Sequence, residues 1–288
     1  MKKKTTKNLE IPRYLKTIFI VLSLLHTNSA IKLALRLFET PFSFKLPKRE
    51  QRMYEVSQKT RFELPKSKKE IVIYENNHGP KKVLLVHGWS GRGTQLVSIA
   101  KAFKKMNYTI ISFDAPGHGK SQKTTTNMKH FIEAIFELEK RYGFFDVVIG
   151  HSLGGMSVIN SLGSGLGAHK AVIIGSGNKT SDIASFFLKN IGMKTNAIGP
   201  FMEAFEKKHN EKMSDYDVET HASKLSIPIL IVHDKDDMDV PVEAALQIHE
   251  NVANSELLIT HKLGHRKILG DEKVIESLLD FVRDYQAT

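Results

Sequence analysis

The sequence of 288 residues contains no cysteine. Disulfide bonds, thiolate metal ligands, a cysteine nucleophile and lipid attachment through cysteine are therefore all excluded. Long apolar runs and low-complexity tracts are lacking as well. The run Ile18–Leu25 has only 8 residues and is bracketed by Lys16 and His26, whereas a transmembrane helix needs about 20. This run therefore cannot cross a bilayer alone.

The positive charge of the chain is confined to its first quarter. Lysine and arginine total 42 against 31 acidic residues, a net charge of +11. Residues 1–70 hold 17 basic and 6 acidic residues, while residues 71–288 hold 25 of each. A nucleic-acid-binding protein usually carries its positive charge on the folded domain. The neutral remainder therefore argues against nucleic acid as a partner, and a hydrophobic fraction of 41% is typical of a globular protein.

Residues 1–70 are interpreted as a basic leader followed by a linker. Four lysines within Met1–Lys7 precede the apolar run, and the pattern from about Tyr14 to Glu39 predicts one basic amphipathic helix that ends before Pro41. Three roles stay open for it. The helix can pack on the domain or a partner subunit, it can lie on an anionic membrane surface, or it can be part of a weak secretory signal. We expect a cytoplasmic protein, with peripheral membrane association as the alternative.

From residue 71 onward, short β-branched runs alternate with longer amphipathic stretches. This alternation predicts βαβ units and a mostly parallel sheet flanked by helices. The predicted strands are Ile71–Glu75, Val83–Val86, Thr109–Phe113, Val147–Ile149, Ala171–Ile174, Ile229–Val232 and Leu257–Thr260. The predicted helices are Thr94–Met106, Met128–Tyr142, Leu153–Leu162, Val242–Val252 and Lys273–Tyr285.

One interval is too long for a single crossover. More than 50 residues separate the predicted strands at Ala171–Ile174 and Ile229–Val232. Two short amphipathic helices are expected within it, around Ser185–Leu188 and Pro200–Glu206. We interpret residues 177–226 as a small helical lid insertion, with ordinary helical packing as the alternative.

A candidate nucleophile follows the predicted strand Val147–Ile149. Residues 150–154 read Gly-His-Ser-Leu-Gly, and a helix is predicted to start at Leu153. A G-x-S-x-G sequence between a strand and a helix predicts a nucleophile elbow, in which Ser152 occupies strained backbone at a tight turn. Glycines at positions 150 and 154 leave space where Cβ atoms would collide. The Leu153 N–H, at the N-terminus of the predicted helix, would face the same side of the turn as the Ser152 hydroxyl.

A serine hydroxyl needs a base, and the base needs an orienting acid. For an elbow of this kind the expected chain order is Ser, acid, His. The loop after Ile229–Val232 holds four aspartates within residues 233–241, and His265 follows the last predicted strand. Both groups lie at the carboxyl ends of parallel strands, where open α/β sheets build their sites. A solvated acidic turn or a weak cation site is the alternative for the aspartates.

These features together resemble the α/β-hydrolase superfamily, from about residue 71 to the end. The resemblance implies an α/β-hydrolase fold for residues 71–288 and assigns the acid to Asp237, with Asp239 in reserve. Asp234 stands where the superfamily usually has glycine. His-Gly-Trp at residues 87–89 resembles the oxyanion loop, which implies backbone N–H donors at Trp89 and Leu153. His87 and His118 are interpreted as turn-stabilising.

The resemblance also implies an activity. With serine rather than aspartate or cysteine at the elbow, it implies hydrolysis of a small-molecule carboxylic ester through Ser152, His265 and Asp237. Neither a cofactor nor a metal is expected. A thioesterase or acyltransferase would use the same residues, and a non-catalytic binding module of the same fold is the alternative from another class.

Overall fold

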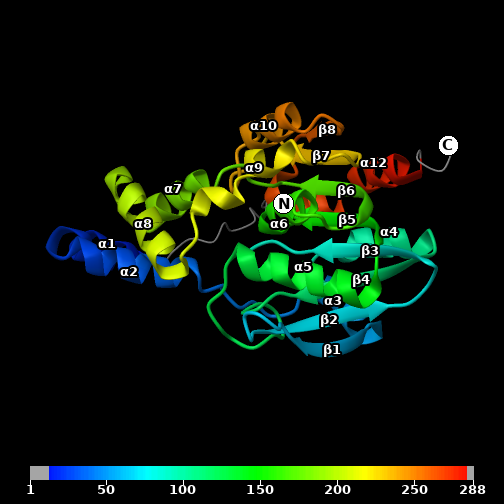
Figure 1. Ribbon diagram of the computed structural model, residues 1–288, viewed down its shortest axis with the longest axis horizontal. Coiled ribbons are helices and arrows are strands. Elements are labelled where there is room, and N and C mark those ends of the chain that lie inside the picture. Colours follow the sequence, from blue (N-terminus) through cyan, green and yellow to red (C-terminus); the bar gives the residue numbers. More distant parts are fainter. Residues whose placement is uncertain (1–12, 284–288) are drawn as a thin grey trace, which may run out of the picture. The chain divides into compact units, whose positions relative to one another are not determined.

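The computed structural model describes residues 13–283. Its centre is an eight-stranded sheet in the order β1-β2-β4-β3-β5-β6-β7-β8, which runs from bottom to top in Figure 1. The β1/β2 and β2/β4 pairs are antiparallel, and all other neighbours are parallel. The strands are β1 Gln58–Glu63, β2 Glu70–Asn76, β3 Lys81–Val86, β4 Tyr108–Asp114, β5 Phe145–His151, β6 Ala168–Ile174, β7 Ile229–Asp234 and β8 Ser255–Thr260.

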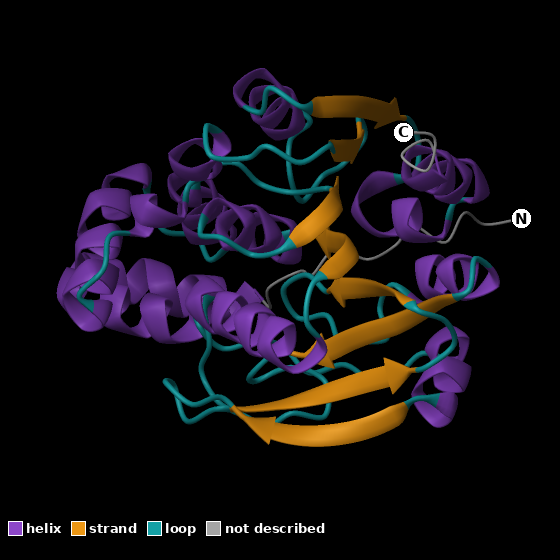
Figure 2. Ribbon diagram, turned by 45° about the vertical axis from the view of Figure 1, so that its right-hand side comes forward, coloured by secondary structure: helices purple, strands orange, loops and turns teal. Residues whose placement is uncertain are grey.

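Helices cover both faces of this sheet (Figure 2). On one face α3, α4 and α12 pack together, and on the other α5, α6, α9 and α10 form a chain of contacts. The helices are α1 Arg13–Leu25, α2 Thr27–Phe38, α3 Lys48–Val56, α4 Val97–Lys105, α5 Met128–Tyr142, α6 Leu153–Gly163, α7 Thr180–Asn190, α8 Ile198–His209, α9 Val218–Ala222, α10 Glu243–Asn251, α11 Gly264–Lys267 and α12 Glu272–Arg283.

The predicted α/β-hydrolase fold, with its mostly parallel sheet between helices, is confirmed. All seven predicted strands are present, because runs such as that of β3 and β7 are buried on both faces of the sheet as their apolar sequences require. The five predicted helices of residues 71–288 are present as α4, α5, α6, α10 and α12. The predicted end of the last helix at Tyr285 lies outside the described residues.

Two elements lie within the stretch that was interpreted as a linker. Helix α3 and strand β1 both precede residue 71, so the linker interpretation is wrong for them. Their sequences are polar, and β1 pairs antiparallel with β2 at the edge of the sheet with every side chain at least partly exposed. An edge strand of this kind carries no buried apolar run, which was the signal used for the other strands.

The chain divides into two compact units. Of the described residues, 40–178 and 216–283 form the unit that contains the sheet, while 13–39 and 179–215 form the other. The smaller unit has its own core, in which Phe19, Ile31 and Leu35 of the N-terminal helices pack with apolar side chains of α7 and α8 such as Leu188 and Phe201. Most of the residues predicted as a lid therefore share a core with the leader. Their action as a lid stays a prediction.

The N-terminal segment forms two helices rather than the single predicted one. Helix α1 ends at Leu25, and α2 begins at Thr27. His26 between them has a φ of −149° and a ψ of 78°, which are not helical values. Residues 27–29 are Thr, Asn and Ser, whose side chains compete for backbone hydrogen bonds and favour helix starts. Within residues 13–283 no helix is long and apolar enough to cross a membrane. The lysines of Met1–Lys7 lie outside the described residues.

A buried carboxylate ties the smaller unit together. Glu39 is 2% exposed and bonds both Lys208 and His209 of α8. Burial alone would raise the pKa of Glu39, but the hydrogen bonds and charges of His209 and Lys208 outweigh it and hold the pKa below its ordinary value of 4.5. Because the native pKa is lowered, the ion pair contributes stability above this value and loses it as the pH falls through the native pKa.

Replacing Glu39 by Gln should destabilise the smaller unit by about 1–3 kcal/mol at neutral pH, since Lys208 and His209 lose their charged partner. Urea unfolding monitored by hydrogen exchange in α2 and α8 measures this loss. The difference from wild type should shrink at acidic pH. The control Glu203→Gln, at an exposed position of α8, should change stability by less than about 0.5 kcal/mol. Equal effects of the two variants would contradict the assignment.

Candidate active site

Ser152 occupies strained backbone between β5 and α6. Its φ is 55° and its ψ is −122°, a conformation that costs a non-glycine residue about 1–3 kcal/mol. The Ser152 N–H donates to the carbonyl of Ile174 on the neighbouring strand β6 at 2.9 Å. The surrounding structure thus holds the serine at the tip of the turn, which is the predicted elbow geometry.

Close backbone packing explains the two glycines of the motif. A Cβ on Gly150 would lie 2.5 Å from the carbonyl oxygen of Gly154. A Cβ on Gly154 would lie 2.4 Å from the carbonyl oxygen of Val86 at the end of β3. Both neighbours are backbone atoms that cannot swing aside. The turn therefore requires glycine at both positions, as the sequence indicated.

His265 and Asp237 are brought together by the loops after β8 and β7. His265 Nδ1 lies 2.7 Å from Asp237 Oδ2, and the Asp237 side chain is only 1% exposed. The other carboxylate oxygen accepts the backbone N–H groups of Asp239 at 2.8 Å and Val240 at 3.0 Å. Burial would raise the pKa of Asp237, but the hydrogen bond and charge of His265 and these N–H groups lower it below its ordinary range. Asp237 is therefore ionised at neutral pH.

The other aspartates of the loop have different partners. Asp239 forms an ion pair with Arg266 at 3.1 Å. The Asp234 carboxylate accepts the Thr260 hydroxyl at 2.7 Å and the Leu263 N–H at 3.1 Å. Asp234 thus fastens the loop that carries the acid to the loop that carries His265. A glycine at this position would have no side chain to make these bonds, so the departure from the superfamily pattern has a structural role.

Two further buried histidines, His151 and His233, lie beside this pair, and the sequence pattern assigns no role to either. The His151 ring lies 4.6 Å from the His265 ring, centroid to centroid, and His151 Nε2 donates to the His265 carbonyl at 2.8 Å. Burial lowers the pKa of His151 to about 3, so its ring is neutral. His233 Nε2 donates to the Val240 carbonyl at 3.0 Å, and burial lowers its pKa too. The contact between His151 and His265 joins residues far apart in sequence, which local patterns do not register.

His87 and His118 stabilise turns, as predicted. His87 Nδ1 donates to the Gly88 carbonyl at 2.7 Å, and its Nε2 accepts the Ala115 N–H at 3.0 Å. His118 Nε2 accepts the Ser90 N–H at 3.0 Å. Burial lowers the pKa of His118 to about 4 and that of His87 well below its ordinary value. Both rings are neutral, and both nitrogens of His87 are used by the backbone.

The loop after β3 lies directly against the elbow. A Cβ on Gly88 would approach the Ser152 Cβ to 2.9 Å, which brings the following residue, Trp89, close to the serine. Among the residues that the structure describes, neither the Trp89 N–H nor the Leu153 N–H has a hydrogen-bond acceptor. Both N–H groups are therefore uncommitted, and their action as oxyanion donors stays a prediction.

The buried carboxylate of Asp114 holds the loop after β3 through hydrogen bonds. Asp114, at the end of β4, accepts the Gly93 N–H at 2.6 Å, the Lys120 N–H at 2.7 Å and the Tyr74 hydroxyl at 2.8 Å. Burial raises its pKa, although the Lys120 and Gly93 N–H groups oppose this effect. With donors on both oxygens, the carboxylate fixes the loop after β3 to the sheet.

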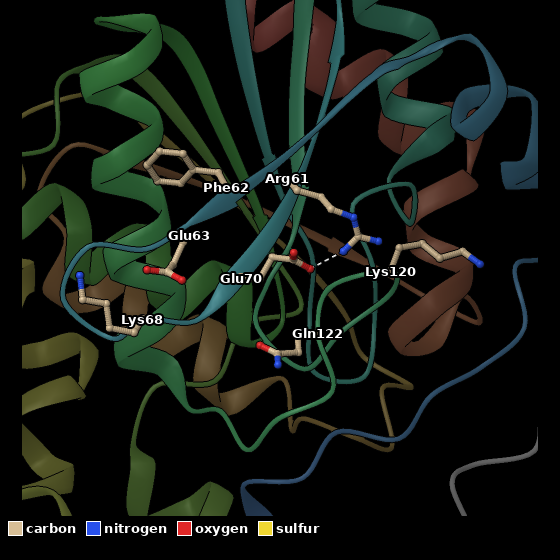
Figure 3. Close-up of a pocket in the computed structure, with 7 residues that line it drawn as sticks. All are labelled: Arg61, Phe62, Glu63, Lys68, Glu70, Lys120 and Gln122. Carbon is tan, nitrogen blue, oxygen red and sulfur yellow. Dashed lines mark hydrogen bonds and ion pairs between the residues drawn. The ribbon is translucent and has the colours of Figure 1, made fainter.

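A separate hollow lies at the edge of the sheet. Figure 3 shows its lining side chains, which come from β1, the start of β2 and nearby loops, and its volume is about 580 Å³. The lining residues are Arg61, Phe62, Glu63, Lys68, Glu70, Lys120 and Gln122. Charged groups of both signs line it, and Arg61 is paired with Glu70. None of Ser152, Asp237 and His265 borders it, so it is distinct from the candidate site.

A weak cation site is the alternative role for the aspartate loop. Within residues 13–283 no group of three or more acidic or histidine side chains is arranged to hold a metal ion.

Replacing Asp114 by Asn should destabilise the larger unit by about 1–3 kcal/mol. In the wild type all three donors meet a carboxylate oxygen, whereas in the variant the amide nitrogen, itself a donor, must face at least one of them. Urea unfolding followed by far-UV circular dichroism measures the loss. Asp280→Asn, at a 59% exposed side chain on α12, is the matched control and should change stability by less than about 0.5 kcal/mol. A stable Asp114→Asn protein would contradict the support role of Asp114.

Solved structures with this fold include several esterases. An esterase from Exiguobacterium antarcticum has a TM-score of 0.63 and 20% identity, and the match covers 78% of this chain and all of that one. A Pyrococcus furiosus esterase has a TM-score of 0.66 and 16% identity, with 85% and 98% covered. A bromoperoxidase from Bacillus anthracis has a TM-score of 0.62 and 19% identity, with 79% and 100% covered. At these identities the likeness concerns the fold alone.

Sequence comparison identifies the family. A Mycoplasma genitalium protein named "Putative esterase/lipase 2" is 28% identical over 96 residues, which are 32% of this chain and 31% of that protein. The match thus spans less than a third of the relative's length. The sequence profile described as "Alpha/beta hydrolase family" matches residues 83–266, well over half of the chain and all three predicted catalytic residues. The chain belongs to the alpha/beta hydrolase family.

Proposed function

We propose that this protein is a serine hydrolase that cleaves carboxylic esters through Ser152, His265 and Asp237. The observation that carries the proposal is the 2.7 Å hydrogen bond between His265 Nδ1 and the buried Asp237 carboxylate. A second observation supports the proposal, because the ring of His151, the residue before Ser152, lies 4.6 Å from the His265 ring. A nucleophile, a base and an orienting acid are the groups that acyl transfer requires.

In the proposed reaction Ser152 Oγ attacks the ester carbonyl carbon while His265 Nε2 takes the hydroxyl proton. The carbonyl oxygen becomes negatively charged and receives hydrogen bonds from the Trp89 and Leu153 N–H groups, which have no other acceptor among the described residues. The intermediate then expels the alcohol, which takes its proton from His265. Water, activated by the same imidazole, releases the acid and restores Ser152.

Asp237 has an orienting and electrostatic role in this scheme. As a carboxylate it keeps the proton of neutral His265 on Nδ1, which leaves the Nε2 lone pair available to accept the serine proton. It also stabilises the imidazolium that forms during attack. The two backbone N–H groups on its other oxygen hold the carboxylate in place.

Thioesters, or an acceptor alcohol in place of water, would use the same residues. A non-catalytic module of this fold would not need a paired, ionised Asp237 or open N–H donors beside a strained serine. A panel of esters and thioesters with varied acyl chains separates the enzymatic alternatives, and labelling by a fluorophosphonate separates all of them from the binding module.

Replacing Ser152 by Ala should lower the hydrolysis of p-nitrophenyl esters by at least about 10³-fold and abolish fluorophosphonate labelling, since the nucleophile is lost. Steady-state kinetics and labelling of purified protein measure both effects. Ser164→Ala, at the exposed C-cap of α6, is the matched control and should retain wild-type turnover. Turnover retained by the Ser152→Ala protein would refute the proposed nucleophile.

A second pair of variants tests the choice of acid. Asp237→Asn should reduce kcat by about 10⁴-fold, because the amide favours the wrong tautomer of His265. Asp239→Asn should change kcat by less than about tenfold, since that carboxylate pairs with Arg266 instead. Both variants remove one negative charge from the same loop, so a common electrostatic effect would appear in both. If Asp239→Asn had the larger effect, the assignment of the acid would be wrong.

A further inference from the structure

The solvent-exposed face of α1 is apolar. Its exposed apolar side chains, here called the apolar stripe, are Tyr14, Ile18, Ile20, Val21, Leu24 and Leu25. Leu24 is 74% exposed, Leu25 is 69% and Tyr14 is 66%. At 100° per residue these positions share one side of the helix, and Thr17 is the one other exposed residue among the side chains described for α1. Surface helices normally present polar residues on that side.

The stripe is distinct from the face that α1 uses for packing. Phe19 is 1% exposed and belongs to the core of the smaller unit, together with Ile31 and Leu35 of α2. Leu22 packs against the same core. The helix is therefore already anchored on its inner side. A contiguous apolar face that remains outside a formed core indicates a binding surface.

Positive charge is exposed on α2, the helix that contacts α1. Helix α2 exposes Lys32 and Arg36, which lie four residues apart and hence on one side of the helix, with the exposed Leu33 beside them. In the sequence, Lys2, Lys3, Lys4 and Lys7 precede α1. Residues 1–70 hold 17 basic and 6 acidic residues, whereas the remainder of the chain is balanced. Exposed apolar side chains on one helix and exposed basic side chains on the next suit the acyl chains and the anionic head groups of a membrane surface.

We propose that the apolar stripe of α1, together with the exposed Lys32 and Arg36 of α2, docks the protein on an anionic lipid surface. Helix α1 has 13 residues and is about 20 Å long, too short for a hydrocarbon core of about 30 Å. It therefore lies along the interface, with leucine, isoleucine and valine among the acyl chains. A second copy of the chain is a poorer occupant, because it would bring two strongly basic segments together.

Vesicle flotation of the full-length protein tests this proposal. The protein should float with vesicles of equal parts phosphatidylglycerol and phosphatidylcholine, should bind vesicles of phosphatidylcholine alone at least tenfold more weakly, and should be released by high salt. The double variant Leu24→Ser/Leu25→Ser should bind the anionic vesicles at least tenfold more weakly, since its two most exposed leucines no longer insert. Both sites are exposed, so the variant should unfold at the wild-type temperature.

The matched control is Val56→Ser/Leu246→Ser, which removes two exposed apolar side chains from α3 and α10 of the larger unit. It should bind vesicles as the wild type does. Ser152→Ala should also bind normally, so failure of the proposed catalysis and failure of membrane docking are distinguishable. Equal binding by the stripe variant and the wild type would overturn the proposal. The proposal would also be overturned if the wild type never floated and light scattering showed it to be a dimer that becomes a monomer in the stripe variant.

Discussion

The strained backbone of Ser152 is the constraint on which the rest of the site depends. A non-glycine residue with positive φ persists only if its neighbours leave it no alternative. Here the Ser152 N–H is bound to β6, and glycines at 150 and 154 let the turn and α6 approach the end of β3. The same approach brings the loop after β3 against the serine. One local distortion thus positions both the proposed nucleophile and the proposed oxyanion donors.

The proposed acid and base, Asp237 and His265, meet because β7 and β8 are neighbours in the sheet. The parallel register pairs Asp234 with Thr260, so the two strands end at the same level and their loops start side by side. The Asp234 carboxylate then bonds both Thr260 and Leu263, which fixes the second loop relative to the first. With the two loops held together in this way, Asp237 Oδ2 lies 2.7 Å from His265 Nδ1. Topology supplies the proximity, and a residue without a catalytic role supplies the alignment.

The buried strands were predictable because each carries an apolar run that only a doubly covered sheet explains. Strand β1 was not, because an exposed edge strand has no such run. Ser152 and the aspartate loop followed from local motifs, whereas the assignment to Asp237 required a family resemblance. The roles of His151 and Asp234 and the shared core of residues 13–39 with α7 and α8 depend on contacts between distant residues. No pattern of local periodicity contains that information.

The neutral histidines around the site bear on its electrostatics. His233 Nε2 lies 3.6 Å from Asp237 Oδ2, close enough to compete with His265 for the carboxylate. Burial lowers the pKa of His233, and its Nε2 proton is donated to the Val240 carbonyl instead. His151, whose ring contacts that of His265, is neutral for the same reason. Because neither ring carries charge, neither opposes the imidazolium that the proposed reaction generates at His265 beside the buried Asp237 carboxylate.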